Sequence, residues 1–387
     1  MKTIYILYCA LIALVAFSAP VSADCNIVGD ANNDDRITTA DSVLALQMSV
    51  GSVAPDLESA DVSGDGKISS LDALMMLTMA QKTQVCVNAP EVVSGAFNVT
   101  IDIYNVVDLD SGKFDLSFDS SVVNVTGVSN GDIDGTTMPI DSWNFTDADI
   151  IRVLFNLSGT TSVSGSGQIA TISFEITGSQ ADTSVMDIFE GLLVDTGANE
   201  ISALWFDSDV AIGVPVTVNA PEVISGAFNA TIDIENVADL DSGEFDLSFD
   251  PSVVNVSDVH NGNIGGTTVP ISDWGFMDAD TIRVLFDLPD GDLVGGSGSL
   301  ATVNFEITGS VGDSSVLDIS NGGLFDPYTY GEGVPAIWND CEVTIGVPVT
   351  VNAPEVISGA FNATIDIENV ADLDSGEFDL SFDPSVV

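Results

Sequence analysis

The sequence has very few positive charges. Lysine and arginine together number 7 in 387 residues, against 59 aspartates and glutamates, and the formal net charge is −52. Seven scattered cations cannot neutralise a run of phosphates, which excludes nucleic acid as a direct partner. The same scarcity excludes attachment to an anionic membrane surface through charge. A chain this acidic repels itself, so divalent cations or salt are expected to screen it.

Catalytic motifs and long amphipathic helices are also missing. No phosphate-binding loop, zinc cluster or nucleophile motif occurs, and nothing between residues 88 and 387 has the period of a long helix. High charge alone does not indicate disorder here, because 45% of the residues are hydrophobic and 19 are phenylalanine. The composition predicts a folded, acidic, mostly β protein, and the missing motifs favour a non-enzyme.

The N-terminus indicates an export signal. An apolar run at residues 4–19 is followed by Val21-Ser22-Ala23, small residues of the kind that signal peptidase accepts. We predict that residues 1–23 are removed and that the mature protein is secreted, either free outside the cell or associated with its surface. The alternative is an uncleaved membrane anchor, which the shortness of the run and Pro20 disfavour.

Cysteines are scarce, and export favours their oxidation. Four occur, of which Cys9 lies in the predicted signal peptide. Cys25 and Cys86 bracket one compact segment, and we predict a disulfide between them, which would close a loop of about 60 residues and stabilise the fold by about 4 kcal/mol. Cys341 is left over, and both a lone buried thiol and an intermolecular bridge remain open for it.

The chain from residue 88 onward is an array of repeats. Asn88-Ala89-Pro90-Glu91-Val92 recurs from residue 219 and from residue 352, with periods of 131 (219 − 88) and 133 (352 − 219) residues. Each period is the size of one domain. Residues 345–387 repeat residues 212–254 without a substitution. We therefore expect a third repeat too short to close its own core, in a fragment of a longer product.

Apolar residues within a repeat have a period of two. Phe245, Leu247 and Phe249 alternate with Asp246 and Ser248, which is typical of strands with one buried face. Many short strands separated by turn residues predict a β-sandwich. The expected division is a signal peptide at 1–23, a helical module at 24–87, sandwiches at 88–214 and 215–347, and an incomplete third repeat at 348–387.

Two acidic loops lie 31 residues apart (61 − 30) in the segment 24–87. Side-chain oxygens fall at positions 1, 3, 5, 9 and 12 of each loop. Calcium takes six to eight oxygen ligands, and position 7 of such a loop supplies a backbone carbonyl. The spacing predicts two Ca²⁺ ions, one held by Asp30, Asn32, Asp34, Arg36, Thr38 and Asp41, and the other by Asp61, Ser63, Asp65, Lys67, Ser69 and Asp72.

The two loops differ at position 6. The second loop has Gly66, which tolerates a sharp turn, whereas the first has Asp35. We expect the first site to bind calcium more weakly. Ile37 and Ile68 at position 8 are expected to pack the loops together, and apolar helices are expected at residues 42–48 and 73–80.

Both loops end in aspartate where an ordinary EF-hand has glutamate, and in this they resemble dockerin modules. The resemblance covers residues 26–82 and rests on two Asp-x-Asn/Ser-x-Asp-x-x-Ile-x-x-x-Asp loops, each followed by a helix. It implies a small α-helical module with two EF-hand-like loops that folds on calcium and binds a partner domain called cohesin. In that family loop positions 10 and 11 face the partner, which implies partner-binding roles for Thr39, Ala40, Ser70 and Leu71.

The repeats resemble cohesin domains, which fold as nine-stranded sandwiches. The segment 242–254, SGEFDLSFDPSVV, is similar to the signature of that family, and the segments 281–286 and 300–308 match its later strands. The first repeat carries the same pattern at residues 111–123. The resemblance implies tandem cohesin-like β-sandwiches preceded by the dockerin.

Together the resemblances imply a secreted, non-catalytic scaffold. Its dockerin would bind a cohesin-bearing surface protein, its cohesins would bind dockerin-bearing proteins, and the family context adds an association with extracellular polysaccharide. A surface adhesin or carbohydrate-binding protein is the alternative. Its best support is four tryptophans that could stack on sugar rings or pack in the cores: Trp143, Trp205, Trp274 and Trp338. A truncated enzyme is a third hypothesis, since dockerins often accompany glycoside hydrolases.

Overall fold

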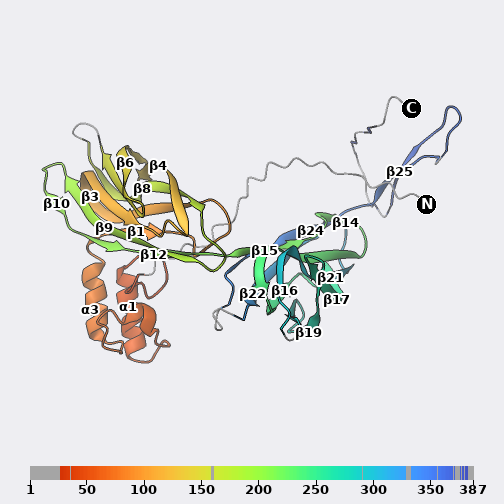
Figure 1. The fold of residues 1–387 in the computed structure, drawn as a ribbon, viewed down its shortest axis with the longest axis horizontal. Coiled ribbons are helices and arrows are strands. Elements are labelled where there is room, and N and C mark those ends of the chain that lie inside the picture. The colour runs from red at the N-terminus through yellow and green to blue at the C-terminus, as the bar shows by residue number, and fades with distance from the viewer. Residues whose placement is uncertain are drawn as a thin grey trace. The chain divides into compact units, whose positions relative to one another are not determined.

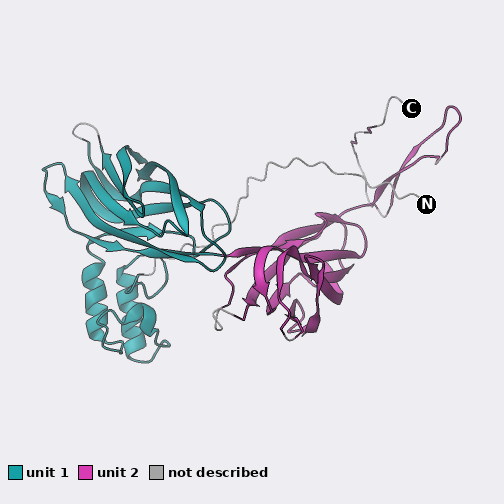
Figure 2. Cartoon of the chain, in the orientation of Figure 1, with its two compact units in different colours: residues 1–212 teal, residues 213–387 magenta. Residues whose placement is uncertain are grey.

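The chain divides into two compact units, residues 1–212 and 213–387 (Figures 1 and 2). The computed structural model describes residues 27–387 except residues 35, 158–160, 290, 328–332, 355, 369, 371–374, 376, 379 and 382–387. The predicted signal peptide and Cys25 lie outside the described residues. Among the helices that are described, none is both long and apolar enough to cross a membrane.

Unit 1 begins with three helices, α1 (Thr39–Ser49), α2 (Leu57–Ala60) and α3 (Ser70–Met79). Helices α1 and α3 start earlier than the apolar pattern predicted, because Thr38 and Ser69 cap their N-termini. The short α2 was not predicted, and its cap is Asp56. The helices and loops enclose a small core that includes Ile37, Ala45, Met48, Ala60, Ala73 and Met76, with Ile68 packed against it.

A β-sandwich forms the rest of unit 1. Its strands are β1 (Thr83–Asn88), β2 (Val92–Val93), β3 (Phe97–Ser117), β4 (Val123–Ile133), β5 (Thr136–Met138), β6 (Ile140–Asp147), β7 (Ile150–Asn156), β8 (Val163–Ile176), β9 (Thr183–Asp195), β10 (Glu200–Ile201), β11 (Ala203–Phe206) and β12 (Ser208–Ile212). Strand β1 begins at Thr83, ahead of the boundary expected at residue 88. The reason is that the repeated Asn-Ala-Pro motif follows the first strand of a sandwich instead of preceding it.

Strand β3 belongs to both layers of this sandwich. Its first half pairs with β1 and β8, and its second half pairs with β7 and β9. Asn105 and Asp108, each with a φ of 58°, lie where the pairing with β8 shifts register. Asparagine and aspartate tolerate this left-handed backbone better than most residues. These positions therefore let one long strand pass from the first layer to the second.

Unit 2 repeats the sandwich in strands β13 to β24. They are β13 (Val214–Asn219), β14 (Val223–Ile224), β15 (Phe228–Leu240), β16 (Ser242–Ser248), β17 (Val254–Ile264), β18 (Thr267–Val269), β19 (Ile271–Phe276), β20 (Thr281–Asp287), β21 (Val294–Ile307), β22 (Ser314–Phe325), β23 (Ala336–Asn339) and β24 (Cys341–Ile345). They form two six-stranded sheets, β18-β17-β21-β15-β13-β23 and β14-β24-β22-β16-β20-β19. More strands are present than the nine implied, because short segments such as β14 pair as strands of their own.

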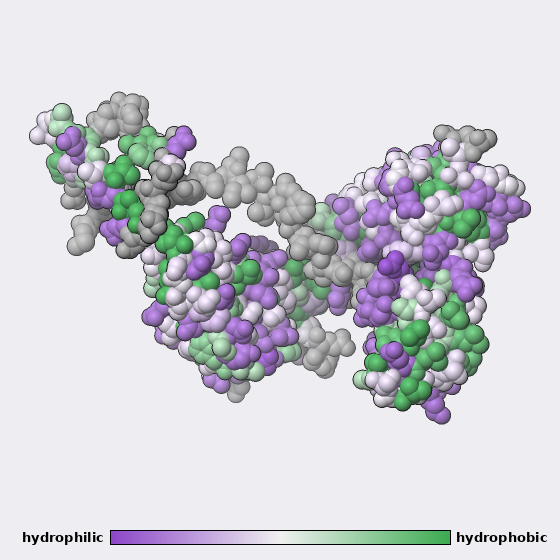
Figure 3. Space-filling model, turned by 180° about the vertical axis from the view of Figure 1, so that it is seen from behind, coloured by the Kyte–Doolittle hydropathy of each residue, from purple (hydrophilic) through white to green (hydrophobic). Residues whose placement is uncertain are grey.

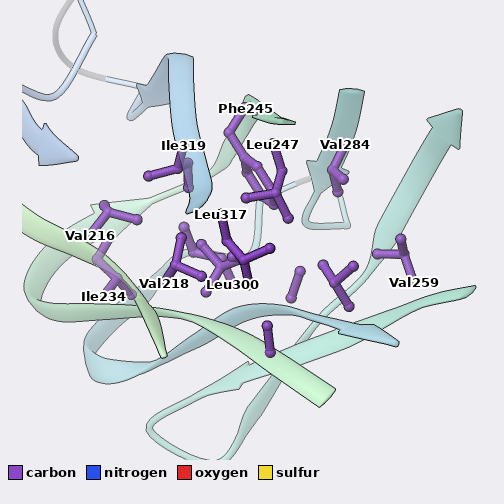
Figure 4. Close-up of a cluster of buried hydrophobic side chains, with 14 of the residues drawn as sticks. Val216, Val218, Ile234, Phe245, Leu247, Val259, Val284, Leu300, Leu317 and Ile319 are labelled. Carbon is purple, nitrogen blue, oxygen red and sulfur yellow. The ribbon is translucent and has the colours of Figure 1, made fainter. Parts of the chain in front are cut away.

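The core of this second sandwich lies between its two sheets (Figure 4). Phe245 and Leu247 of β16 are both fully buried, as the period of two predicted. Phe305 of β21 is 1% exposed and stacks on Phe228 with ring centroids 5.1 Å apart. Aromatic and branched side chains from both layers therefore close the sandwich.

The third repeat begins in the same way. Strand β25 (Val349–Asn352) pairs with β26 (Thr364–Ile367) in the register that β13 has with β15. Val349 and Val351 are 55% and 52% exposed, whereas their equivalents Val216 and Val218 are buried. The described part of this repeat is a hairpin whose apolar side chains face solvent.

Asp102, on β3 of the first sandwich, carries a buried carboxylate. It is 7% exposed, and Oδ2 accepts a 2.9 Å hydrogen bond from Asn88, while Oδ1 has no hydrogen-bond partner among the described residues. Burial raises the pKa of Asp102, against the hydrogen bonds from Asn88 and Thr100, which lower it. A raised pKa in the folded state means that ionisation opposes folding at neutral pH.

An Asp102→Asn chain should therefore be more stable than the native chain at pH 7. The difference should shrink as the pH falls towards about 4, where aspartate in the unfolded chain also becomes protonated. Thermal unfolding between pH 4 and 7 measures this. The control is Asp233→Asn, at the equivalent but half-buried position of the second sandwich, which should change little. A lower melting temperature for Asp102→Asn at pH 7 would contradict the prediction.

Candidate functional site

The first acidic loop brings three carboxylates together. One oxygen each from Asp30, Asp34 and Asp41 lies within 4.8 Å of the others. Asp41 is fully buried, and its Oδ1 accepts from the Asn32 amide at 3.1 Å. Asp30 is buried as well, and it accepts from the amides of Asp34 and Arg36. The chain is thus wrapped around a pocket of carboxylate oxygens.

Hydrogen bonds organise the second loop in the same pattern. The Asp72 carboxylate accepts from the Ser63 amide at 2.9 Å, and the Ser63 hydroxyl donates to Asp61 at 3.2 Å. Asp61 also accepts from the amides of Asp65 and Gly66. Burial raises the pKa of Asp72, but the amides and hydroxyls of Ser63 and Ser69 outweigh it and hold that pKa below its usual value. The carboxylate is therefore kept charged.

The last residue of each loop also caps a helix. At α1, the Thr38 side chain caps the helix and Asp41 accepts from the Thr38 amide at 2.7 Å; Ser69 and Asp72 do the same at α3, with 2.8 Å. This is the reciprocal capping box, which places a negative charge at the positive end of the helix dipole. The start of each helix is thus tied to the loop that precedes it.

Calcium fits this donor set. The side chains at the predicted positions 1, 3, 5, 9 and 12 offer only hard oxygen donors, apart from the amide nitrogen of Asn32, and three of these side chains in each loop are carboxylates. Arg36 at position 7 is exposed and its Nε lies 3.6 Å from Asp34, a surface ion pair worth little stability. In the first loop the three carboxylates lie close together. In the second loop Ser63 forms hydrogen bonds with both Asp61 and Asp72. Asp35 lies outside the described residues, and the identity and number of bound ions stay predictions.

Apolar side chains are exposed on the two helices after the loops. The predicted partner-binding residues Thr39, Ala40, Ser70 and Leu71 are all exposed. Further along, Val43 and Leu46 of α1 are 53% and 43% exposed, and their counterparts one loop repeat later, Leu74 and Leu77 of α3, are 58% and 37% exposed. Figure 3 shows apolar side chains gathered over this part of unit 1. Exposed apolar surface of this kind is the property that a partner-binding face requires.

Each sandwich contains an arginine–aspartate pair at equivalent positions, which sequence reasoning missed. Arg152 of β7 forms two hydrogen bonds with Asp115 of β3, and Arg283 of β20 does so with Asp246 of β16 at 2.7 and 2.8 Å. The hydrogen bonds from Arg283 lower the pKa of Asp246, although burial opposes this. The Ile-Arg-Val-Leu-Phe segment common to both repeats was the available signal. Asp246 thus lies on the outward face of β16 but is buried beneath Arg283.

The four tryptophans pack against the cores. Trp143 and Trp205 are partly buried against the first core, and Trp274 and Trp338 against the second. Any side chain at Gly191 or Gly322 would collide with Trp205 or Trp338. The arrangement agrees with the hypothesis that the tryptophans pack against the cores. It does not present a row of exposed rings on which sugars could stack.

The cysteines fall into two environments. Cys86 on β1 is disulfide-bonded and fully buried, while Cys341 on β24 is free and half-buried. The predicted partner Cys25 lies outside the described residues, so the pairing of Cys25 with Cys86 stays a prediction.

Comparison with known families identifies the modules. The cohesin domain family matches residues 83–210 and 214–345, and the dockerin type I domain family matches residues 28–78. The cohesin matches cover more than half of the chain, which therefore belongs to the cohesin family. It joins two tandem cohesin domains to an N-terminal type I dockerin domain, as the residue patterns implied. Both kinds of domain are non-catalytic assembly modules.

Related proteins match parts of the chain. Cellulose-binding protein A of Clostridium cellulovorans is 25% identical over 323 residues, which is 78% of this chain and 17% of that protein. The type II cohesin dyad from the adaptor ScaA scaffoldin of Acetivibrio cellulolyticus covers 68% of this chain and 98% of its own, with 13% identity and a TM-score of 0.29. A non-cellulosomal cohesin from the archaeon Archaeoglobus fulgidus covers 34% and 91%, with 19% identity and a TM-score of 0.30. The chain spans only a small part of its curated relative.

Proposed function

We propose that this chain is a secreted scaffold that assembles proteins through calcium-dependent cohesin–dockerin binding. The observation that carries the proposal is one chain with a dockerin domain, whose helices expose apolar side chains at equivalent positions, and two cohesin domains. Such a chain can be bound at one end and can bind others along its length. The dockerin would attach it to a cohesin-bearing surface protein, and the cohesins would take up dockerin-bearing proteins.

Calcium would hold the dockerin in its binding shape. We assign one ion to each loop, with the ligand positions given by the loop pattern and the carboxylates of Asp30, Asp34 and Asp41 and of Asp61, Asp65 and Asp72 at their centres. The ion neutralises charges that otherwise repel each other. Because each terminal aspartate also caps a helix, the ion stabilises the helix start that carries the partner-facing residues.

An association with extracellular polysaccharide is the finer part of the proposal. Its support is the likeness to a cellulose-binding protein. The described tryptophans are partly buried against the cores, so the chain would reach polysaccharide through the proteins that it assembles. The predicted signal peptide supports secretion.

Calorimetric titration of calcium into oxidised, calcium-free residues 24–387 tests the proposal. Two binding events are expected, with helical circular dichroism gained. A panel of immobilised type I cohesins should then capture the chain in calcium and release it in chelator. The matched variant Leu46→Asp with Leu77→Asp alters only exposed side chains and should abolish capture while leaving calcium binding intact. No calcium binding, or glycan-array binding without cohesin capture, would contradict the proposal and favour an adhesin.

A further inference from the structure

One buried glutamine of the first sandwich forms two hydrogen bonds with the dockerin. Gln84 of β1 is fully buried, its Oε1 accepts from the Ile37 amide at 2.9 Å, and its Nε2 donates to the Ile37 carbonyl at 2.9 Å. One side chain thus satisfies both backbone groups of a residue 47 positions away. The two hydrogen bonds hold the side-chain amide of Gln84 in one orientation, because the loss of either bond would leave a buried polar group without a partner.

Ile37 is position 8 of the first calcium loop. Its neighbours in sequence are predicted ligands, the carbonyl of Arg36 and the side chain of Thr38. Ile37 is itself fully buried, and its apolar cluster includes residues of the sandwich, namely Cys86 of β1, Tyr104 of β3 and Phe206 of β11. The sandwich therefore fixes the middle of the loop by hydrogen bonds and by packing.

The second sandwich lacks these contacts although it shares the fold. Strand β13 pairs with β15 and β23 as β1 pairs with β3 and β11. The residues equivalent to Gln84, Cys86, Tyr104 and Phe206 are Pro215, Thr217, Glu235 and Asn339. Proline at the position of Gln84 has no side-chain donor or acceptor, and Glu235 and Asn339 replace the aromatic rings of Tyr104 and Phe206. The contacts that hold the first calcium loop are therefore specific to the first sandwich and are not shared by every domain with this fold.

We infer that the first sandwich pre-shapes the first calcium loop and that Gln84 is a positioning residue for the calcium bound there. The inference rests on the proposed calcium binding. Ligands held in place before binding lose less conformational freedom when the ion enters. The second loop has Gly66 at position 6, where a φ of 79° suits glycine.

Calcium titration of oxidised residues 24–387 carrying Gln84→Leu tests this. Leucine is similar in size but leaves both Ile37 backbone groups unpaired. Asp41→Ala and Asp72→Ala chains assign the two binding events to the two loops. Gln84→Leu should weaken the first-loop event about tenfold, as loss of a supporting residue commonly does, and leave the second-loop event within about twofold. The control is Gln168→Leu, the same change at an exposed position on β8, which should alter neither.

Each outcome decides the question. Equal affinities in the Gln84→Leu and native chains, or equal weakening of both sites, would overturn the inference while the proposed function stands. An absence of calcium binding in the native chain would remove both. Should Gln84→Leu fail to fold, hydrogen exchange of the native chain in chelator serves instead. The Ile37 amide should exchange slowly there and the Lys67 amide, which donates to the exposed Asp65, rapidly; fast exchange at Ile37 would overturn the inference.

Discussion

An Asp72→Ala chain is expected to lose one of two calcium-binding events and to unfold at a lower temperature. The fully buried Asp72 carboxylate accepts from the Ser63 amide at 2.9 Å, the Ser69 amide at 2.8 Å and the Ser69 hydroxyl at 3.0 Å. Losing the hydrogen bonds that Asp72 accepts as its half of the capping box costs about 1 kcal/mol. Losing calcium costs about 2.7 kcal/mol more when calcium is present at a hundred times its dissociation constant. Calorimetry and thermal circular dichroism measure the two effects.

Asp72→Asn separates the cap from the metal site. Asparagine keeps one carbonyl oxygen that can accept from Ser63 or Ser69, but it lacks the charge that calcium requires. Its stability in chelator should therefore lie between those of the native and Asp72→Ala chains, while most of the gain on adding calcium disappears. Full calcium stoichiometry in both variants would show that Asp72 is not a ligand.

A Phe305→Ala chain should lose about 3–5 kcal/mol of unfolding free energy in the second sandwich. Phe305 is 1% exposed, stacks on Phe228 and meets the edge of Phe249 at 5.8 Å. Removing the ring leaves a cavity between the two layers, and the layers cannot close it by moving together. Urea unfolding followed by tryptophan fluorescence measures the loss, and calcium binding by the dockerin should not change.

Phe325→Ala supplies the control. Phe325 lies on β22 of the same sandwich but is 37% exposed, so its removal should cost much less. A loss below about 1 kcal/mol for Phe305→Ala would mean that the aromatic stack does not hold the layers together, in contrast to other buried phenylalanines.

Local patterns predicted the modules well. The period of two placed Phe245 and Leu247 inside, and the spacing of aspartates in each loop placed the helices that follow. The dockerin and the tandem cohesin domains, which the resemblances implied, are confirmed by the family comparisons. The buried positions and the loops depend on residues close in sequence, whose periodicity and spacing can be read directly.

Contacts between residues far apart in the sequence could not be predicted in this way. The bonds of Gln84 to Ile37 span 47 residues, and the pairing of Arg152 with Asp115 spans 37. Nothing in a local pattern indicates which distant partner a buried glutamine or arginine meets. The boundary expected at residue 88 falls after the start of β1 for a related reason. A repeated motif shows the period of a repeat but not the point within the fold at which each repeat begins.

The residues of the first sandwich that contact the dockerin are absent from the later repeats. The third repeat copies the second and not the first, so Pro348, Thr350 and Glu368 stand where Gln84, Cys86 and Tyr104 stand in the first repeat. Copies of the second repeat lack the side chains that contact the first calcium loop, so adding such copies leaves the contact between the dockerin and the first sandwich unchanged.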